Sequence, residues 1–251
     1  MNRQFLSYIS SILIVIFITF TAYKTYQFSL KYDDEIYKNA QNNKIENKID
    51  NYIDKLIPIF KNEVDKKPTT YKVDMDFYKL LFFIGVGLIF MTYFISTKEV
   101  FTISIITVAL VSWFVGVFAP IMSIEIFKEL PIFGYTIFKY DTKSIYSTIE
   151  KLWILQNYLV SVMVAVFSMI IPLVKTIALY ISTTMKVDIK YIDFIGKWSM
   201  ADVFVISLLL ANLSLSSDEF TDAKVQVGIY FFSCYVVLSI FASYILNLDR
   251  E

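Results

Sequence analysis

Two charged side chains stand inside apolar runs that are long enough to cross a membrane. They are Lys175 in "SMIIPLVKTIALY" and Asp202 in "GKWSMADVFVI". Ionisable residues in membrane spans are rare, and they usually face a bundle interior, a cavity or one another. Lys175 lies about 10 Å from the end of its run at 1.5 Å per residue, and Asp202 enters the next run from the same side. Consecutive spans are usually neighbours, so we expect Lys175 and Asp202 to lie close enough to pair.

Small polar residues accompany both charges. The spacing along the sequence places five residues on one face of a helix: Ser161, Ser168, Pro172, Lys175 and Thr176. Pro172 predicts a helix kink, and it frees a backbone carbonyl one turn back that must find another partner. Ser199 lies three residues before Asp202, on the same side of its run. The predicted internal polar cluster, at the floor of a cavity, comprises Lys175, Asp202, Ser199, Thr176 and Ser168; the family resemblance described below implies lipid binding or proton coupling for it.

Each charge also has a purely structural interpretation. The stem of Lys175 is long enough to carry its ammonium to the membrane interface without any partner. Asp202 is also placed where the dipole at a helix N-terminus favours a carboxylate. Trp198 is typical of an interfacial aromatic belt, and Cys234, midway along an apolar run, is expected to serve packing.

The residue inventory excludes most enzymatic chemistry. The chain has 251 residues, of which 57 % are hydrophobic; it has no histidine and one cysteine. A histidine-ligated metal, a cysteine zinc site, a Ser-His-Asp triad and an internal disulfide are therefore excluded. No phosphate-binding glycine motif occurs. The 23 basic residues balance 23 acidic ones and give no case for nucleic-acid binding. We expect neither an enzyme nor a cofactor.

Six apolar runs approach the length of about 20 residues that a membrane span requires. They cover residues 5–23, 77–96, 100–119, 157–182, 199–215 and 223–246. The first run lacks a signal-peptidase site, so an uncleaved anchor is favoured over a cleaved signal. Basic residues of the termini and short loops fall on one side: Arg3, Lys98, Lys186, Lys190, Lys197 and Arg250. The predicted topology is therefore N-in and C-in, with 24–76 and 120–156 outside and the acidic loop 214–222 on that outer side.

The two long outer segments differ in character. In 24–76, apolar residues recur at helical spacing from Ile45 to Phe60, which predicts a helix rising from the first span; a partner-binding helix is the alternative. In 120–156, β-formers on either side of Pro131 and Gly134 predict a small extracytoplasmic β-hairpin. Asp141 or Thr142 is then expected to cap a helix leading into the fourth span. We divide the chain into a transmembrane pair (1–96) and a four-helix module (97–251).

Three stretches of the second part carry a family resemblance. They are "APIMSIEIF" (119–127), "IIPLVKTIALY" (171–181) and "GKWSMADVFVISLLLANLSL" (196–215), followed by Gly228 and Tyr230. Residues 97–251 thereby resemble the paraquat-inducible protein A family, which includes the lipophilic envelope-spanning tunnel A proteins of diderm bacteria. Residues 1–96 are foreign to the family pattern, and the cysteine-rich zinc ribbons of many members have no counterpart here.

The resemblance implies a function as well as a fold. The fold is an all-α integral membrane protein with six transmembrane helices, the last four forming a tetraspan module with a small extracytoplasmic β-hairpin. Such proteins are inner-membrane partners of mammalian-cell-entry (MCE) domain proteins, which carry lipids across the periplasm. Lys175 and Asp202 would map to the polar core of the module. The implied partners are membrane lipids and a periplasmic MCE-domain protein, with a homo-oligomer left open. The alternative is a structural or adaptor membrane protein without transport activity.

Overall fold

The computed structural model describes residues 3–53, 70–94, 96–130, 134–185 and 221–248. Five helical segments in these ranges are long and apolar enough to cross a membrane: Tyr8–Lys38, Thr70–Thr92, Lys98–Phe118, Tyr158–Met185 and Val227–Leu246. The predicted class, an all-α membrane protein with a small β-element, is confirmed. The predicted span 199–215 lies outside the described residues.

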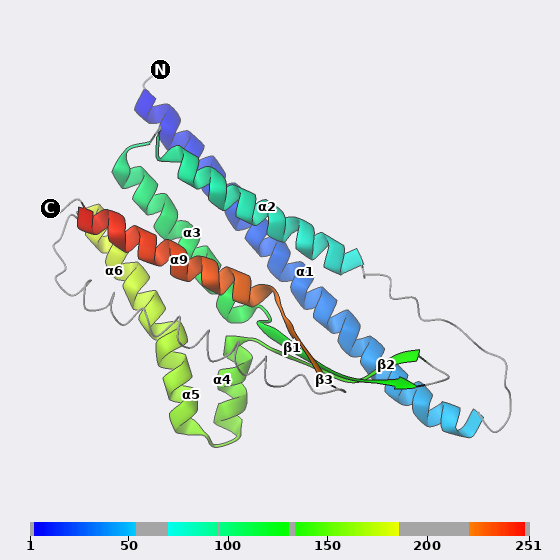
Figure 1. Cartoon of the computed structure of the whole chain (residues 1–251). Helices are drawn as coiled ribbons and strands as arrows, with labels where there is room; N and C mark the ends of the chain where they lie inside the picture. Colours follow the sequence, from blue (N-terminus) through cyan, green and yellow to red (C-terminus); the bar gives the residue numbers. More distant parts are fainter. Residues whose placement is uncertain (1–2, 54–69, 95, 131–133, 186–220, 249–251) are drawn as a thin grey trace.

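Helix α1 joins two features that the sequence presents separately. It runs without a break from Arg3 to Ile53, 51 residues, and so measures about 76 Å at 1.5 Å per residue. The predicted helix rising from the first span is therefore continuous with that span (Figure 1). Helix α2 (Thr70–Thr92) begins seven residues before its predicted start at 77, because the polar segment "TYKVDMD" is already helical.

The predicted β-hairpin is present and gains a third strand. Strands β1 (Met122–Leu130) and β2 (Gly134–Lys143) pair antiparallel, and β3 (Thr221–Val225) pairs with the other side of β1. The prediction of a loop at 214–222 followed directly by a span from 223 is therefore wrong for 221–225. The cause is pairing between distant residues, Met122 with Val225 and Ile126 with Thr221, which local sequence does not reveal.

The buried face of β1 is its polar face. Ser123 and Glu125 are almost fully buried. Gln226 Nε2 donates to Ser123 Oγ at 2.7 Å, and Lys224 Nζ donates to Glu125 Oε2 at 2.6 Å. Each buried polar group on β1 thus has a partner at or just after β3, which explains why this face tolerates burial.

The expected cap at Asp141 or Thr142 is wrong. Both residues belong to β2, and helix α4 (Ile145–Ile154) is capped by Ser144, whose hydroxyl accepts from the Ser147 backbone N–H while Ser147 Oγ accepts from the Ser144 N–H. Helix α4 does not continue into the fourth span either. The chain reverses at Gln156, where φ is 61°, and α5 (Tyr158–Ala165) begins two residues later. The π-helical turn Val166–Ile170 and α6 (Ile171–Met185) follow.

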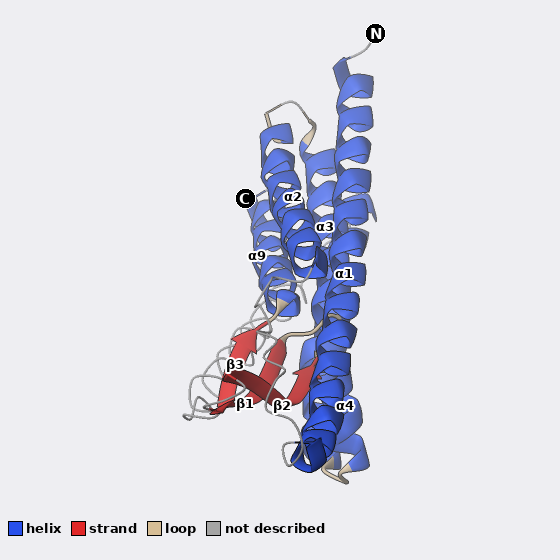
Figure 2. Cartoon of the chain, turned by 90° about the vertical axis from the view of Figure 1, so that its right-hand side faces the viewer, coloured by secondary structure: helices blue, strands red, loops and turns tan. Residues whose placement is uncertain are grey.

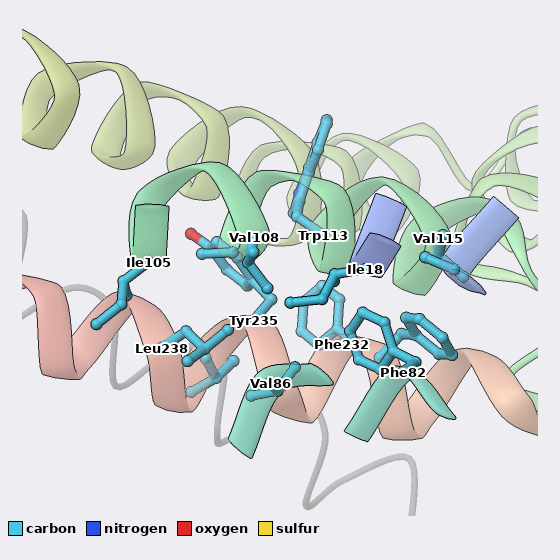
Figure 3. Close-up of a cluster of buried hydrophobic side chains, with 14 of the residues drawn as sticks. Ile18, Phe82, Val86, Ile105, Val108, Trp113, Val115, Phe232, Tyr235 and Leu238 are labelled. Carbon is cyan, nitrogen blue, oxygen red and sulfur yellow. The ribbon is translucent and has the colours of Figure 1, made fainter. Parts of the chain in front are cut away.

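The core lies between α3 (Lys98–Phe118) and α9 (Val227–Leu248), with α1 and α2 packed on one side (Figure 3). Phe82 of α2 packs against Phe231 of α9 with ring centroids 4.3 Å apart. Two glycines permit the close approach of α3 and α9. A Cβ at Gly116 would lie 2.7 Å from the Phe232 backbone nitrogen, and one at Gly228 would lie 2.7 Å from the Ala119 carbonyl oxygen.

The elements sort to two ends of the molecule. The N-terminus of α1, the α2–α3 turn and the C-terminal ends of α6 and α9 share one end (Figure 1). The three-stranded sheet and the α4–α5 turn lie toward the other end, and the sheet rests against the second half of α1 (Figure 2). The predicted placement of 24–76 and 120–156 outside the membrane stays a prediction.

Candidate functional site

The candidate site is built on the long helical segment from Tyr158 to Met185, which is interrupted just before its proline. The N–H of Ile171 bonds to the Val166 carbonyl, five residues back, and this closes the π-helical turn Val166–Ile170. Pro172 follows at once, without an N–H of its own. Proline and π-turns are two recognised causes of helix deformation and often mark functional positions. The predicted interruption at Pro172 thus coincides with an irregular turn.

The predicted polar stripe of this segment is buried. Ser161, Ser168, Pro172, Lys175 and Thr176 all lie in the protein interior, and the buried face continues through Leu179, Ser182 and Thr183. Residues between them, such as Val174 and Ile177, are exposed on the opposite side. The polar stripe therefore faces the protein interior, with Ser161 bonded to α4 and the Ser168 and Pro172 carbonyls to α3 and α9, while the apolar groups face the surroundings of the helix.

The carbonyl freed by Pro172 has found a partner. Residue 172 offers no N–H to the Ser168 carbonyl, and the Trp113 indole Nε1–H of α3 donates to that oxygen at 3.3 Å instead. Figure 3 shows Trp113, a member of the buried cluster, on the side of α3 that faces the α5–α6 segment. One turn further, the Pro172 carbonyl accepts from the Tyr235 hydroxyl of α9 at 3.0 Å and from Thr176 Oγ1 at 2.9 Å. The irregular turn is thus held from both neighbouring helices.

Lys175 is 2 % exposed and ranks among the largest fully buried side chains of the protein. The alternative in which its ammonium reaches the surface alone is therefore wrong. The side chain takes part in a polar, ring or electrostatic interaction. Asp202 and Ser199 lie outside the described residues, so the pairing of Lys175 with Asp202 stays a prediction.

Trp113 and Tyr235 are not among the predicted site residues. Both are polar-tipped aromatics within apolar runs, and such residues usually find a hydrogen-bond partner when they are buried. The sequence therefore shows two aromatic donors that need acceptors and, because of Pro172, a helix carbonyl that needs a donor. It does not show that these groups meet, because 55 and 63 residues separate the partners.

The described residues hold no group of three or more Cys, Asp or Glu side chains that could bind a metal ion. Cys234 lies beside Ser112, whose hydroxyl is 3.9 Å from the sulfur, and this contact belongs to the α3–α9 packing. Among the described residues, the site offers the buried Lys175 side chain together with buried hydroxyls on the same helix.

A second buried polar contact joins α1 to the sheet. The Tyr140 hydroxyl of β2 donates to Asp33 Oδ1 of α1 at 2.8 Å. Burial raises the pKa of the Tyr140 phenol, and the nearby Asp33 carboxylate raises it further. Tyr140 therefore stays protonated as a donor at neutral pH. This contact joins the first helix to the three-stranded sheet.

Comparison with curated proteins and with solved structures finds no match. Comparison with protein-family models does find one. The model described as Paraquat-inducible protein A matches residues 100–250, which is more than half of the chain and includes α3, the sheet, the Trp113–Pro172–Tyr235 contacts and Lys175. The chain therefore belongs to the paraquat-inducible protein A family.

Proposed function

We propose that the protein is an inner-membrane component of an intermembrane lipid transport system that loads lipid onto, or receives it from, a periplasmic MCE-domain partner. Family membership supports a membrane-associated, stress-related protein, and the apolar helices make it a multi-pass one. The N-in, C-in orientation, the inner membrane and the MCE partner belong to the proposal.

The observation that carries the proposal is the full burial of Lys175 within a membrane-spanning helix, one turn after an irregular turn. Burying an ammonium is costly unless it is compensated, so intramembrane charges are usually functional. Lys175 already takes part in an interaction within the protein, and in the proposed mechanism an anionic lipid phosphate binds to the same side chain during transport. The π-turn and Pro172 supply a point at which the Tyr158–Met185 segment can bend to admit it.

In this mechanism Lys175 attracts the headgroup or exchanges a proton with Asp202, and Thr176, Ser168 and Ser199 complete the polar lining. Trp113 and Tyr235 donate to the Ser168 and Pro172 carbonyls, and so keep the Tyr158–Met185 segment packed against α3 and α9 until a lipid binds. The described residues contain no nucleotide-binding glycine loop, so a proton gradient, a lipid gradient or a partner supplies the energy.

Lipid retention tests the assigned role. The full chain and Lys175→Met are extracted with their surrounding membrane by a styrene–maleic acid polymer, and bound phospholipids are quantified by mass spectrometry. We expect Lys175→Met to lose enrichment of anionic phospholipid. Lys79→Met is the matched control, because Lys79 lies near the membrane boundary on α2 and pairs with Asp76 at 2.6 Å. Equal anionic enrichment in all three proteins, with full lipid transfer between donor and acceptor vesicles, would refute the role.

A second candidate is an adaptor without transport activity. It is favoured by the length of α1, which runs about 30 Å past Asp33, the residue that contacts the sheet. Under this function, deleting residues 39–53 abolishes the cellular phenotype, whereas Lys175→Met changes only stability. The transport function predicts a loss with either variant.

A further inference from the structure

The α4–α5 hairpin carries a concentrated apolar tip. Five large apolar side chains at or beside its turn are at least half exposed: Trp153, Ile154, Leu155, Tyr158 and Leu159. Ile154 and Leu159 are more than 70 % exposed. Single exposed apolar residues are ordinary, but a contiguous patch of this kind indicates an interaction surface.

The hairpin is itself firmly held, so this exposure is not a frayed end. Ser161 Oγ of α5 donates to the Ile149 carbonyl of α4 at 2.9 Å. Tyr146 of α4 packs on Phe118 of α3 at 5.5 Å between ring centroids, and Ile145 is buried. At the tip, Trp153 and Tyr158 form an edge-to-face pair with centroids 5.0 Å apart.

The level of the tip along the membrane normal follows from helix geometry. Trp113 and Ser168 are in contact and so mark one level on α3 and on the antiparallel Tyr158–Met185 segment. Along the axis of α3, the distance from Trp113 to Phe118, where the helix ends, is about 7.5 Å. Along the Tyr158–Met185 segment, the distance from Ser168 to Tyr158 is about 15 Å. Tyr158 therefore lies about 7.5 Å beyond the end of α3. The polar headgroup layer of one leaflet is about 5–8 Å thick, so the tip coincides with it.

Residue type and charge agree with that level. Trp and Tyr side chains are enriched at membrane interfaces because one end is apolar and the other polar. The apolar surface of the tip also continues into the exposed apolar surface of α5, at Val160, Val162 and Met163. The charges of the neighbouring Glu150 and Lys151 are opposite and cancel. Lys151 Nζ also lies 3.4 Å from Asp141 Oδ2. Attraction to the membrane is thus hydrophobic rather than electrostatic.

We infer that the α4–α5 tip is an interfacial anchor, inserted into the phospholipid headgroup layer on the sheet side of the membrane. It would hold the start of the Tyr158–Met185 segment at a fixed depth and so define where the π-turn sits in the bilayer. This inference depends on the protein spanning a membrane and is independent of lipid transport.

Spin-label depth measurement tests the anchor in the full chain. In a Cys234→Ala background, Ile154→Cys and Leu159→Cys are each labelled with a nitroxide and reconstituted into phosphatidylcholine vesicles. Two exposed positions serve as references: Lys38→Cys, on α1 five residues past the sheet contact Asp33, and Ile240→Cys, midway along α9. Accessibility to oxygen, which concentrates in the bilayer, and to the aqueous complex NiEDDA gives a depth parameter for each label.

We expect depth parameters in the order Ile240, Leu159, Ile154, Lys38, with both tip positions clearly above Lys38. Values equal to that of Lys38 would overturn the anchor, because the tip would then be in water and available to a soluble partner. Low accessibility to both reagents would also overturn it, since protein would then cover the tip. Adding phosphatidylglycerol should leave the order unchanged. A requirement for the anionic lipid would refute the hydrophobic account of insertion.

Discussion

At the scale of single residues, Pro172 is important because it offers no N–H to the Ser168 carbonyl, which must then accept a hydrogen bond from another group. The Ser168 carbonyl depends on the Trp113 indole, whereas the Pro172 carbonyl accepts from both Tyr235 and Thr176. The two aromatic donors are thus not equivalent. One satisfies an acceptor that residue 172 cannot serve, and the other adds to an acceptor already satisfied by Thr176.

This asymmetry predicts different losses of stability. Trp113→Phe leaves a buried carbonyl without its donor and is expected to cost about 1–3 kcal/mol of unfolding free energy. Tyr235→Phe removes one of two donors and is expected to cost about 0.6 kcal/mol, as interhelical hydrogen bonds in membranes do. Unfolding in mixed micelles of increasing sodium dodecyl sulfate fraction measures both. Equal costs would contradict the assigned roles of the two carbonyls.

The Tyr140 phenol gives a prediction for pH. Its pKa is raised in the folded protein, so from neutral pH up to the ordinary phenol pKa of 10.0 the phenol contributes its full stability through the contact with Asp33. That contribution is lost as pH rises beyond 10.0 toward the folded value. Hydrogen exchange of the α1 amides near Asp33, corrected for intrinsic rates, should show constant protection from pH 7.5 to pH 9. A fall in protection within that window would contradict the prediction.

At the scale of elements, α3 and α9 approach closely because glycine replaces a side chain at their contact. The hypothetical Cβ of Gly116 meets the Phe232 backbone, which cannot rotate away as a side chain can. Gly87 on α2 differs, since a Cβ there meets nothing within 4 Å. Gly116 and Gly87 are thus helical glycines in opposite environments.

These environments predict opposite effects of the same substitution. Gly116→Ala must displace backbone and is expected to destabilise the protein by about 1–3 kcal/mol. Gly87→Ala is expected to be neutral or to stabilise by up to about 1 kcal/mol, because alanine is the better helix former. Thermal unfolding in detergent, monitored by circular dichroism, compares the two directly. A comparable loss in both would contradict the prediction, because the close α3–α9 contact at Gly116 would then not distinguish the two positions.

At the scale of the whole molecule, the first helix and the four-helix module are joined outside the apolar core as well as within it. Ile18 of α1 is part of the common core, and Asp33 meets Tyr140 on the sheet. The sheet in turn ties β3, and through it the start of α9, to β1. The outer contact therefore couples the N-terminal helix to elements from the far end of the chain.

Breaking that contact should loosen α1 relative to the sheet without unfolding the bundle. Tyr140→Phe removes the donor to a buried carboxylate and is expected to cost about 1.5–3 kcal/mol of local stability. Asp33→Asn keeps an acceptor oxygen for Tyr140 and should cost less. Hydrogen exchange read by mass spectrometry should rise in α1 residues 28–38 and in β2, and stay unchanged in α3. Unchanged exchange in α1 would show that the core alone fixes this helix.

Much of this architecture follows from the sequence because its determinants are local. Apolar length predicts the spans, and the fixed spacing of a helix places Ser161, Ser168 and Lys175 on one face wherever that helix packs. Pro131 and Gly134, between runs of β-formers, predict the hairpin. The absence of histidine removes whole classes of chemistry by inventory alone.

Tertiary structure decides what depends on distant partners. Residues 221–225 form a strand because β1 offers them an edge, and Ser144, rather than Asp141, caps α4 because β2 extends to Lys143. The sequence shows that Pro172 leaves a carbonyl to satisfy, but only packing brings Trp113 to it. The physical reason is common to all three: helix and strand periodicity act between near neighbours, whereas these contacts join segments whose meeting depends on how the whole bundle closes.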